Sequence, residues 1–113
     1  VDWLAIVAFG ALAIGCGLWW LSPGVEWYVG SSGVLHAAAA AGIVERIVAR
    51  ARERWLLLAL LVGKVALEQL LQAAGRREPM VVVDAHLYGA AAGFAIGAAL
   101  CGRTAIIRRR QGA

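Results

Sequence analysis

The stretch HLYGAAAGFAIG, residues 86–97, indicates how the helices of this chain are expected to pack. Glycine recurs in it every four residues, at Gly89, Gly93 and Gly97, which places these residues on one face of a helix. Small residues at this spacing let two membrane helices approach closely. The residues from Ala37 to Ala41 form an alanine-rich run, so we expect the helix that contains them to be the partner.

The composition is typical of a membrane protein rather than of a soluble domain. Of the 113 residues, 62% are hydrophobic and 16% are charged, and the charged residues fall in clusters between long apolar runs. These runs approach the ~20 residues with which a helix crosses a bilayer core about 30 Å thick. We therefore predict an all-α, polytopic helix bundle in the lipid bilayer, with residues 1–113 in a single domain.

Four transmembrane helices are expected, each ending at a turn signal or at a cluster of charge. Their expected ranges are residues 3–21, 32–50, 55–74 and 83–103. On propensity alone, the β-prone residues 79–83 are a candidate strand for pairing with an extended substrate. Cys16 and Cys101 lie within apolar runs, where we interpret them as small packed hydrophobes. We expect no metal ion and no cofactor.

The arginines indicate how the bundle is oriented. They cluster between residues 46 and 54 and again between residues 103 and 110, at the ends of helices. The positive-inside rule places both clusters, and with them the C-terminus, in the cytoplasm. Aromatic residues at helix ends are typical of an interfacial belt, and they are Trp3, Trp19, Trp20, Trp27, Tyr28 and Trp55.

The net charge of +4 does not indicate a nucleic-acid partner. Its arginines lie where membrane helices end, and they form no basic face with interleaved aromatic residues. The high content of alanine, glycine and arginine is typical of a GC-rich bacterial genome. We therefore expect a multi-pass protein of the bacterial inner (cytoplasmic) membrane.

Ser32 and His86 are polar residues that are expected at a similar depth in the membrane. Ser32, in the motif GSSG of residues 30–33, begins the second expected helix, and His86 lies near the start of the fourth. Counting from Arg46 and Arg103, they lie roughly 21 Å and roughly 26 Å above the cytoplasmic boundary. In a core about 30 Å thick, both are just below the outer surface. A polar side chain at such a depth needs a partner or a function.

A serine and a histidine at one depth fit nucleophilic catalysis. Histidine is the usual base that takes the proton of a serine hydroxyl, so Ser32 is the candidate nucleophile and His86 the candidate base. The helix N-terminus around Gly30, Ser31 and Gly33 offers backbone N–H groups and a positive dipole end to an oxyanion. Three simpler roles remain open: helix capping by either serine, packing by the glycines, and a hydrogen bond from the histidine to a loop carbonyl.

Other polar residues are expected near this pair. His36 lies one turn from Ser32 and is a rival base, which we assign to packing against or hydrogen bonding with His86. Ser31 is a rival nucleophile, about 100° around the helix from Ser32. On the third helix, Lys64 and Glu68 share a face with Gln72.

Lys64 and Glu68 are charged residues within an apolar helix. Counting from Arg54 places Lys64 roughly 15 Å into the membrane, near its midplane, and Glu68 roughly 21 Å, level with Ser32. Charges at these depths must pair and face inward, so we favour a structural ion pair between them. A role for Glu68 in orienting a histidine, or in binding the end of a substrate, remains open.

The two motifs together resemble the rhomboid family of intramembrane serine proteases. The G-x-S-G motif matches at residues 30–33, and A-H-x-x-G-x-x-x-G matches at residues 85–93. Within that family, the stretch GSSGVLH, residues 30–36, is most similar to the rhombosortase branch. The resemblance implies a Ser–His dyad that cleaves membrane-anchored proteins near the outer face through an acyl-enzyme. For this branch, it implies removal of a C-terminal sorting tail that follows a Gly-Gly motif.

The chain departs from the pattern of this family in two ways. Rhomboids usually take a histidine and an asparagine of the oxyanion hole from an earlier helix, and this chain corresponds to the last four of six core helices. We therefore expect it to be part of a longer protein, with further helices before Val1. Many rhomboids also carry a tyrosine four residues after the nucleophile, which stacks on the catalytic histidine. Here that position is His36.

Two other classes of function remain open on the sequence. A rhomboid-like scaffold would bind transmembrane segments without cutting them. A transporter or ion-relay fragment would depend on Lys64 and Glu68, the charges within the third helix.

Overall fold

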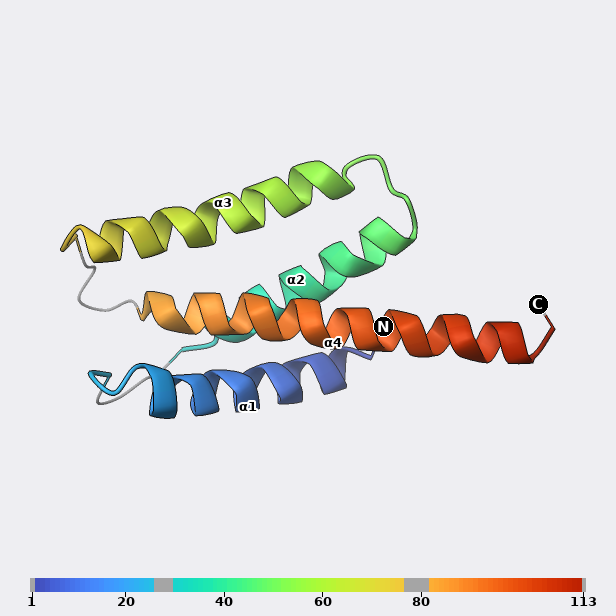
Figure 1. The fold of residues 1–113 in the computed structure, drawn as a ribbon, viewed down its shortest axis with the longest axis horizontal. Coiled ribbons are helices and arrows are strands. Elements are labelled where there is room, and N and C mark those ends of the chain that lie inside the picture. Colours follow the sequence, from blue (N-terminus) through green and yellow to red (C-terminus); the bar gives the residue numbers. More distant parts are fainter. Residues whose placement is uncertain (1, 26–29, 77–81, 113) are drawn as a thin grey trace.

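The computed structural model describes residues 2–25, 30–76 and 82–112. Throughout these ranges the chain forms α-helices joined by turns, with no strand, so the predicted all-helical fold is confirmed (Figure 1). The helices are α1 (Trp3–Leu21), α2 (Ser32–Val48), α3 (Arg54–Ala73) and α4 (Val83–Arg110). Residues 79–81 of the segment expected to be β-prone lie outside the described residues, and its last residue, Val83, begins α4.

The fourth helix is longer than expected. The prediction that it ends at Arg103 is wrong, because α4 continues to Arg110 and extends past the other helices (Figure 1). Basic residues mark a membrane boundary, but a helix ends at a glycine, a proline or a cap. After Arg103, the first such residue is Gly112, which has a positive φ of 74°.

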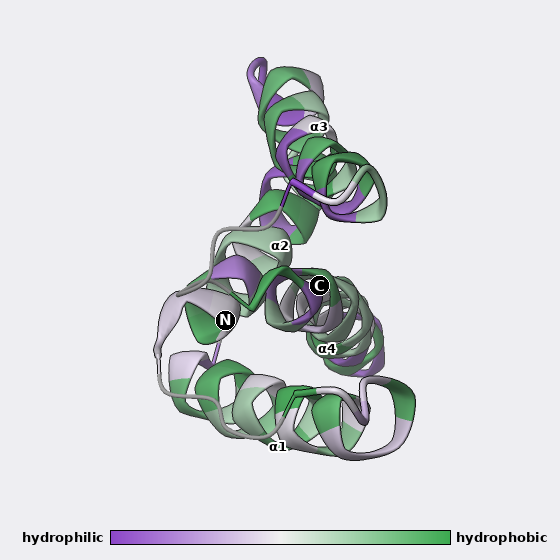
Figure 2. Ribbon diagram, turned by 90° about the vertical axis from the view of Figure 1, so that its left-hand side faces the viewer, coloured by the Kyte–Doolittle hydropathy of each residue, from purple (hydrophilic) through white to green (hydrophobic). Residues whose placement is uncertain are grey.

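Three of the described helices, α1, α3 and α4, are long and apolar enough to cross a membrane. α2 has 17 residues, a length at the lower end of the range of about 17–25 for a span. α2 lies between α3 and α4 in the end-on view of Figure 2, and it contacts each of the other three described helices. The chain is a multi-pass membrane protein.

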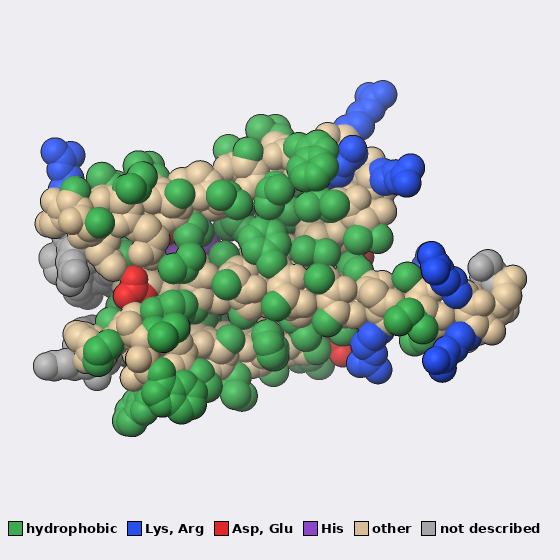
Figure 3. Space-filling model, in the orientation of Figure 1, with side chains coloured by type: hydrophobic (Ala, Val, Ile, Leu, Met, Phe, Trp, Pro, Cys, Tyr) green, Lys and Arg blue, Asp and Glu red, His purple; other side chains and the backbone are tan. Residues whose placement is uncertain are grey.

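The distribution of apolar side chains is that of a protein in lipid. Large hydrophobic side chains cover the outer surface, with Leu4 83% and Trp19 79% exposed (Figure 3). The buried core instead contains many alanines, including Ala37, Ala40 and Ala41. In water this arrangement would leave large apolar patches exposed, whereas acyl chains cover them in a bilayer. Trp27 and Tyr28 of the expected aromatic belt lie outside the described residues.

The centre of the bundle is the contact between α2 and α4, which is the most extensive between any two described helices. A Cβ added at Gly89 would lie 2.0 Å from the carbonyl oxygen of Gly33. At Gly93 it would lie 2.1 Å from the carbonyl oxygen of Ala37, and at Gly97 it would lie 2.9 Å from the Cα of Ala41. The backbones of α2 and α4 therefore touch along the glycine face, against the alanine-rich partner that the spacing predicts.

The two outer helices flank this centre from opposite sides (Figure 2). α1 packs against α2 and α4, where Ile14 and Leu18 form a small apolar cluster with Ala85. α3 makes fewer contacts, and among its residues only Leu61 and Val65 are buried. α3 is therefore the helix whose position depends least on apolar packing.

The connection between α2 and α3 carries an exposed ion pair. Arg46 Nε donates to Glu53 Oε1 at 2.8 Å, and Arg50 between them adopts a left-handed φ of 54°. A hydrogen bond from its own backbone N–H, and then the Arg46 guanidinium, lower the pKa of the Glu53 carboxyl. Both side chains are exposed, so this pair contributes little to stability, but it provides a carboxylate outside the membrane-spanning segments.

Candidate active site

Ser32 and His86 are brought together because two helices begin at the same end of the bundle. Ser32 is the first residue of α2, and His86 lies in the first turn of α4. The backbone contact between Gly33 and Gly89 lies beside both residues and fixes the distance between the two helix starts. As a result, His86 Nε2 lies 2.9 Å from Ser32 Oγ, within hydrogen-bond distance.

The partners of His86 determine which of its nitrogens carries the proton. His86 Nδ1 lies 2.8 Å from Glu68 Oε2 on α3. An ionised carboxylate only accepts hydrogen bonds, so Nδ1–H donates to Glu68. The lone pair of Nε2 then faces Ser32 Oγ–H, which is the tautomer that a general base requires. His86 is 5% exposed, so water competes little for either nitrogen.

His36 stacks on His86 instead of replacing it. The two ring centroids are 4.2 Å apart, with 10° between the ring planes. His36 Nδ1 donates to the backbone oxygen of Ser32 at 2.7 Å, and its Nε2 lies 3.2 Å from Lys64 Nζ. Both ring nitrogens of His36 therefore have partners other than the Ser32 hydroxyl, an arrangement that suits a packing role better than that of a base.

Lys64 and Glu68 form the ion pair that was favoured from the sequence, but Glu68 also has a second partner. Lys64 Nζ donates to Glu68 Oε1, while Glu68 Oε2 accepts from His86. Lys64 also reaches His36, so the pair contacts both histidines. The open interpretation of Glu68 as a group that orients a histidine thus has a geometric basis.

A second polar network, which was missed in the sequence, holds the start of α4. Ser22 Oγ, just after α1, donates to Asp84 Oδ2 at 2.7 Å and lies 2.6 Å from Tyr88 Oη. Gln72 Nε2, from α3, donates to Asp84 Oδ1 at 2.9 Å. The network therefore joins α1 and α3 to the turn of α4 that carries His86. Asp84, an acidic residue at the edge of an apolar run, was the signal that could have indicated it.

The glycine-serine turn is compatible with an oxyanion site at the start of α2. Ser31 occupies the N-cap position, yet its side chain makes no capping hydrogen bond within the described chain. The hydroxyl of Ser32 is directed to His86 rather than to the first turn of the helix. The positive end of the α2 dipole is thus next to the candidate nucleophile, while Gly30 and Gly33 flank the turn without side chains.

Three side chains of this cluster have the chemistry to bind a divalent metal ion. His36, Glu68 and His86 each offer a ligand atom, and these atoms all lie within 4.8 Å of one another. The ammonium group of Lys64 already contacts His36 and Glu68. A metal ion bound there would face the charge of Lys64 at close range, so the lysine opposes metal binding.

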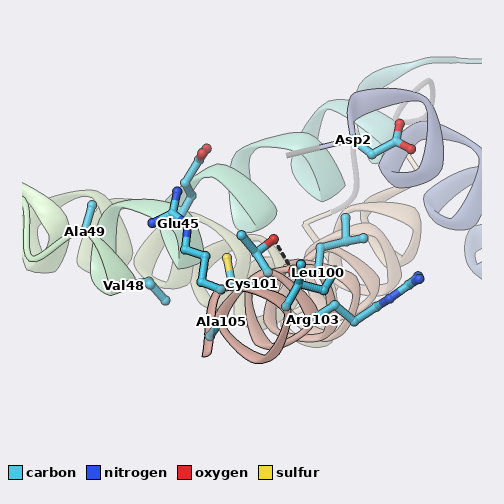
Figure 4. Close-up of a pocket in the computed structure, with 11 residues that line it drawn as sticks. Asp2, Glu45, Val48, Ala49, Leu100, Cys101, Arg103 and Ala105 are labelled. Carbon is cyan, nitrogen blue, oxygen red and sulfur yellow. Dashed lines mark hydrogen bonds between the residues drawn. The ribbon is translucent and has the colours of Figure 1, made fainter. Parts of the chain in front are cut away.

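Among the described residues, two of the cavities lie away from this cluster. One, of about 730 Å³, lies where the C-terminal halves of α2 and α4 meet, and Figure 4 shows Glu45, Cys101 and Arg103 around it. The other, of about 310 Å³, lies between α3 and α4 and is lined by apolar side chains such as Leu61, Leu87 and Phe94. The first is at the opposite end of α2 from Ser32, whereas the second includes the residue that follows His86.

Comparison with protein families supports one assignment. The model of the rhomboid domain matches residues 1–103, which is nearly the whole chain. Comparisons with curated proteins and with solved structures gave no match. The family of intramembrane proteases is the one indicated by the two motifs, and the helical bundle agrees with it. The chain therefore belongs to the rhomboid family.

Proposed function

We propose that this protein is an intramembrane serine endopeptidase in which Ser32 is the nucleophile and His86 the general base. The observation that carries the proposal is the distance of 2.9 Å between Ser32 Oγ and His86 Nε2, at two helix starts inside a membrane bundle. A serine hydroxyl becomes a useful nucleophile when a base accepts its proton, and the Nε2 lone pair faces that proton. Membership of the rhomboid family supports the same chemistry.

The proposed reaction has two stages. In the first, His86 Nε2 takes the proton of Ser32 as Oγ attacks the carbonyl carbon of the scissile bond. The oxyanion forms beside the N-terminus of α2, and the proton then passes from His86 to the leaving amine. In the second, a water molecule gives a proton to His86 and attacks the ester on Ser32, which releases the acid product and restores the hydroxyl. Transfer of the acyl group to another amine would follow the same second stage.

The proposed substrate is a membrane-anchored protein that is cut near the outer face of the bacterial inner membrane. The arginines at the far ends of α2 and α4 support a cytoplasmic C-terminus, with Ser32 at the opposite, periplasmic side. The similarity of residues 30–36 to rhombosortases supports a site after a C-terminal Gly-Gly motif. We further propose that residues 1–113 form one rhomboid-like unit.

The proposal is tested by labelling the protein in proteoliposomes with a fluorophosphonate probe, and by cleavage of a membrane-anchored substrate with a Gly-Gly motif. We expect labelling of the wild type, and its complete loss in Ser32→Ala. His86→Ala should lower the labelling rate about 100-fold or more, because the base is absent. Ser31→Ala is the matched control, since it removes the neighbouring hydroxyl, and it should label within about twofold of wild type.

Two results would contradict the proposal. One is labelling or cleavage that persists in Ser32→Ala, which would place the nucleophile elsewhere. The other is a wild type that binds transmembrane segments but neither labels nor cleaves, which would favour the non-catalytic scaffold. An ion-relay function has less support, because Lys64 and Glu68, on which it would depend, contact the histidines of the proposed site.

A further inference from the structure

We infer that Glu68 is a positioning residue that makes the proposed site a triad of Ser32, His86 and Glu68. The inference rests on the proposed function, and it concerns how the base is held rather than which residue is the nucleophile. Glu68 would keep the proton of His86 on Nδ1 and stabilise the imidazolium that forms when Nε2 takes the proton of Ser32.

The contacts of Glu68 distinguish this role from a purely structural ion pair. Each of its two carboxylate oxygens has its own partner: Oε1 accepts from Lys64, and Oε2 accepts from His86 Nδ1 at 2.8 Å. An ion pair with Lys64 would be satisfied without the second contact. The side chain of Glu68 is 21% exposed and that of His86 is 6% exposed, so little water reaches the hydrogen bond between them.

Lys64 determines which kind of atom at residue 68 can face it. An ammonium group only donates hydrogen bonds, so the atom of residue 68 that faces Lys64 must be an acceptor. In the wild type this is of no consequence for His86, since both carboxylate oxygens accept. With an amide in place of the carboxylate, however, the single oxygen would turn to Lys64, and the NH₂ group would turn to His86.

This asymmetry predicts an unusual result for the conservative variant Glu68→Gln. The amide NH₂ would donate to Nδ1 and force the proton of His86 onto Nε2, the atom that must accept the proton of Ser32. We expect kcat for substrate cleavage to fall about 100-fold, with KM within about twofold of wild type. Glu53→Gln is the matched control, because it removes a carboxylate paired with Arg46 outside the site, and it should retain wild-type kcat.

Removing the ammonium donor of Lys64 should then restore part of the activity that Glu68→Gln loses. In the double variant Glu68→Gln with Lys64→Met, the amide is free to turn its oxygen to His86 Nδ1–H. We expect kcat about 10-fold higher than in Glu68→Gln alone. If Glu68 served only to balance the charge of Lys64, Lys64→Met would also relieve Glu68→Gln, but the tautomer of His86 would then be the same in all of these variants. A Glu68→Gln variant within about twofold of wild type, or a double variant no more active than Glu68→Gln, overturns the inference.

A spectroscopic measurement tests the same point without catalysis. The chain has two histidines, so His36→Phe leaves the ¹⁵N signals of His86 alone in the spectrum of the histidine-labelled protein. In this background we expect Nδ1 to be protonated with Glu68 present, and Nε2 to be protonated after Glu68→Gln. An unchanged tautomer overturns the inference while leaving the Ser32→Ala test intact. Conversely, the proposed function itself would be contradicted by labelling that does not depend on Ser32, whatever the tautomer of His86.

Discussion

Each ring nitrogen of the two histidines has one identified partner, and these partners distinguish the role of His86 from that of His36. His86 is in contact with Ser32, with Glu68 and with the ring of His36. His36 is held by the backbone of Ser32 on one side and by Lys64 on the other. The ring of His86 is thus fixed in its plane by stacking and within that plane by two hydrogen bonds.

The stacking contact can be tested separately from the hydrogen bonds. In His36→Ala we expect the rate of fluorophosphonate labelling to fall about 2- to 10-fold, since an aromatic pair is worth about 0.5–1.5 kcal/mol. His36→Phe keeps a flat ring against His86 but loses both hydrogen bonds of His36, and it should recover most of that loss. A phenylalanine variant slower than the alanine variant would show that the polar contacts of His36, rather than its ring, support His86.

The sequence indicated this site only in part, for a geometric reason. Equal depth and the motif spacing predicted that Ser32 and His86 lie near each other. The i, i+4 spacing also predicted the pair of Lys64 and Glu68. It left open whether Glu68 orients a histidine, because spacing gives the face of a helix but not the direction in which that face points. The contact of Asp84 with Ser22, across 62 residues, was missed for the same reason.

At the level of helices, the position of the proposed catalytic pair depends on the contact between α2 and α4. Gly33, Ala37 and Ala41 of α2 are spaced every four residues, as are the glycines of α4 that face them. The contacts are between backbone atoms, which cannot move aside as the end of a flexible side chain can. A change in the distance between these helices would therefore reach Ser32 and His86 directly.

Gly93→Ala tests this dependence. The new Cβ would lie 2.1 Å from the carbonyl oxygen of Ala37, so α4 must shift away from α2. We expect a loss of about 1–3 kcal/mol in stability, measured by thermal unfolding in detergent, and slower fluorophosphonate labelling. Gly102→Ala on the same helix meets nothing within 4 Å and should stabilise the protein by up to about 1 kcal/mol. Equal effects of the two substitutions would contradict the backbone contact.

For the whole molecule, the order of the helices was easier to predict than their ends. The starts of α1, α2 and α4 agree with the ranges expected from apolar runs and turn signals. The end of α4 was not predicted, because the chain beyond Arg103 contains good helix formers and the membrane boundary alone does not stop a helix. The basic residues on this extension lie at the same end of the molecule as those between α2 and α3 (Figure 3).

The basic residues gathered at one end of the molecule predict its topology in the membrane. The proposed site of cleavage requires that Ser32 lie on the periplasmic side. Gly24 follows α1 at the end where Ser32 and His86 lie, and Gly112 follows the basic end of α4. Neither glycine has a neighbour within 4 Å of an added Cβ, so a cysteine has room at both positions, although at Gly112 it gives up the left-handed φ of 74° beyond the end of α4. The background for the experiment is Cys16→Ser with Cys101→Ser, which removes the two native thiols.

In spheroplasts, we expect a membrane-impermeant maleimide to react with Gly24→Cys and not with Gly112→Cys. In inverted membrane vesicles the result should be reversed, because the positive-inside rule keeps the arginines at the end of α4 in the cytoplasm. Detergent should make both cysteines reactive, which controls for thiols that are merely hidden by protein. Reaction of Gly112→Cys in intact spheroplasts would place Ser32 at the cytoplasmic face, where the proposed substrates would have to present their cleavage site inside the cell.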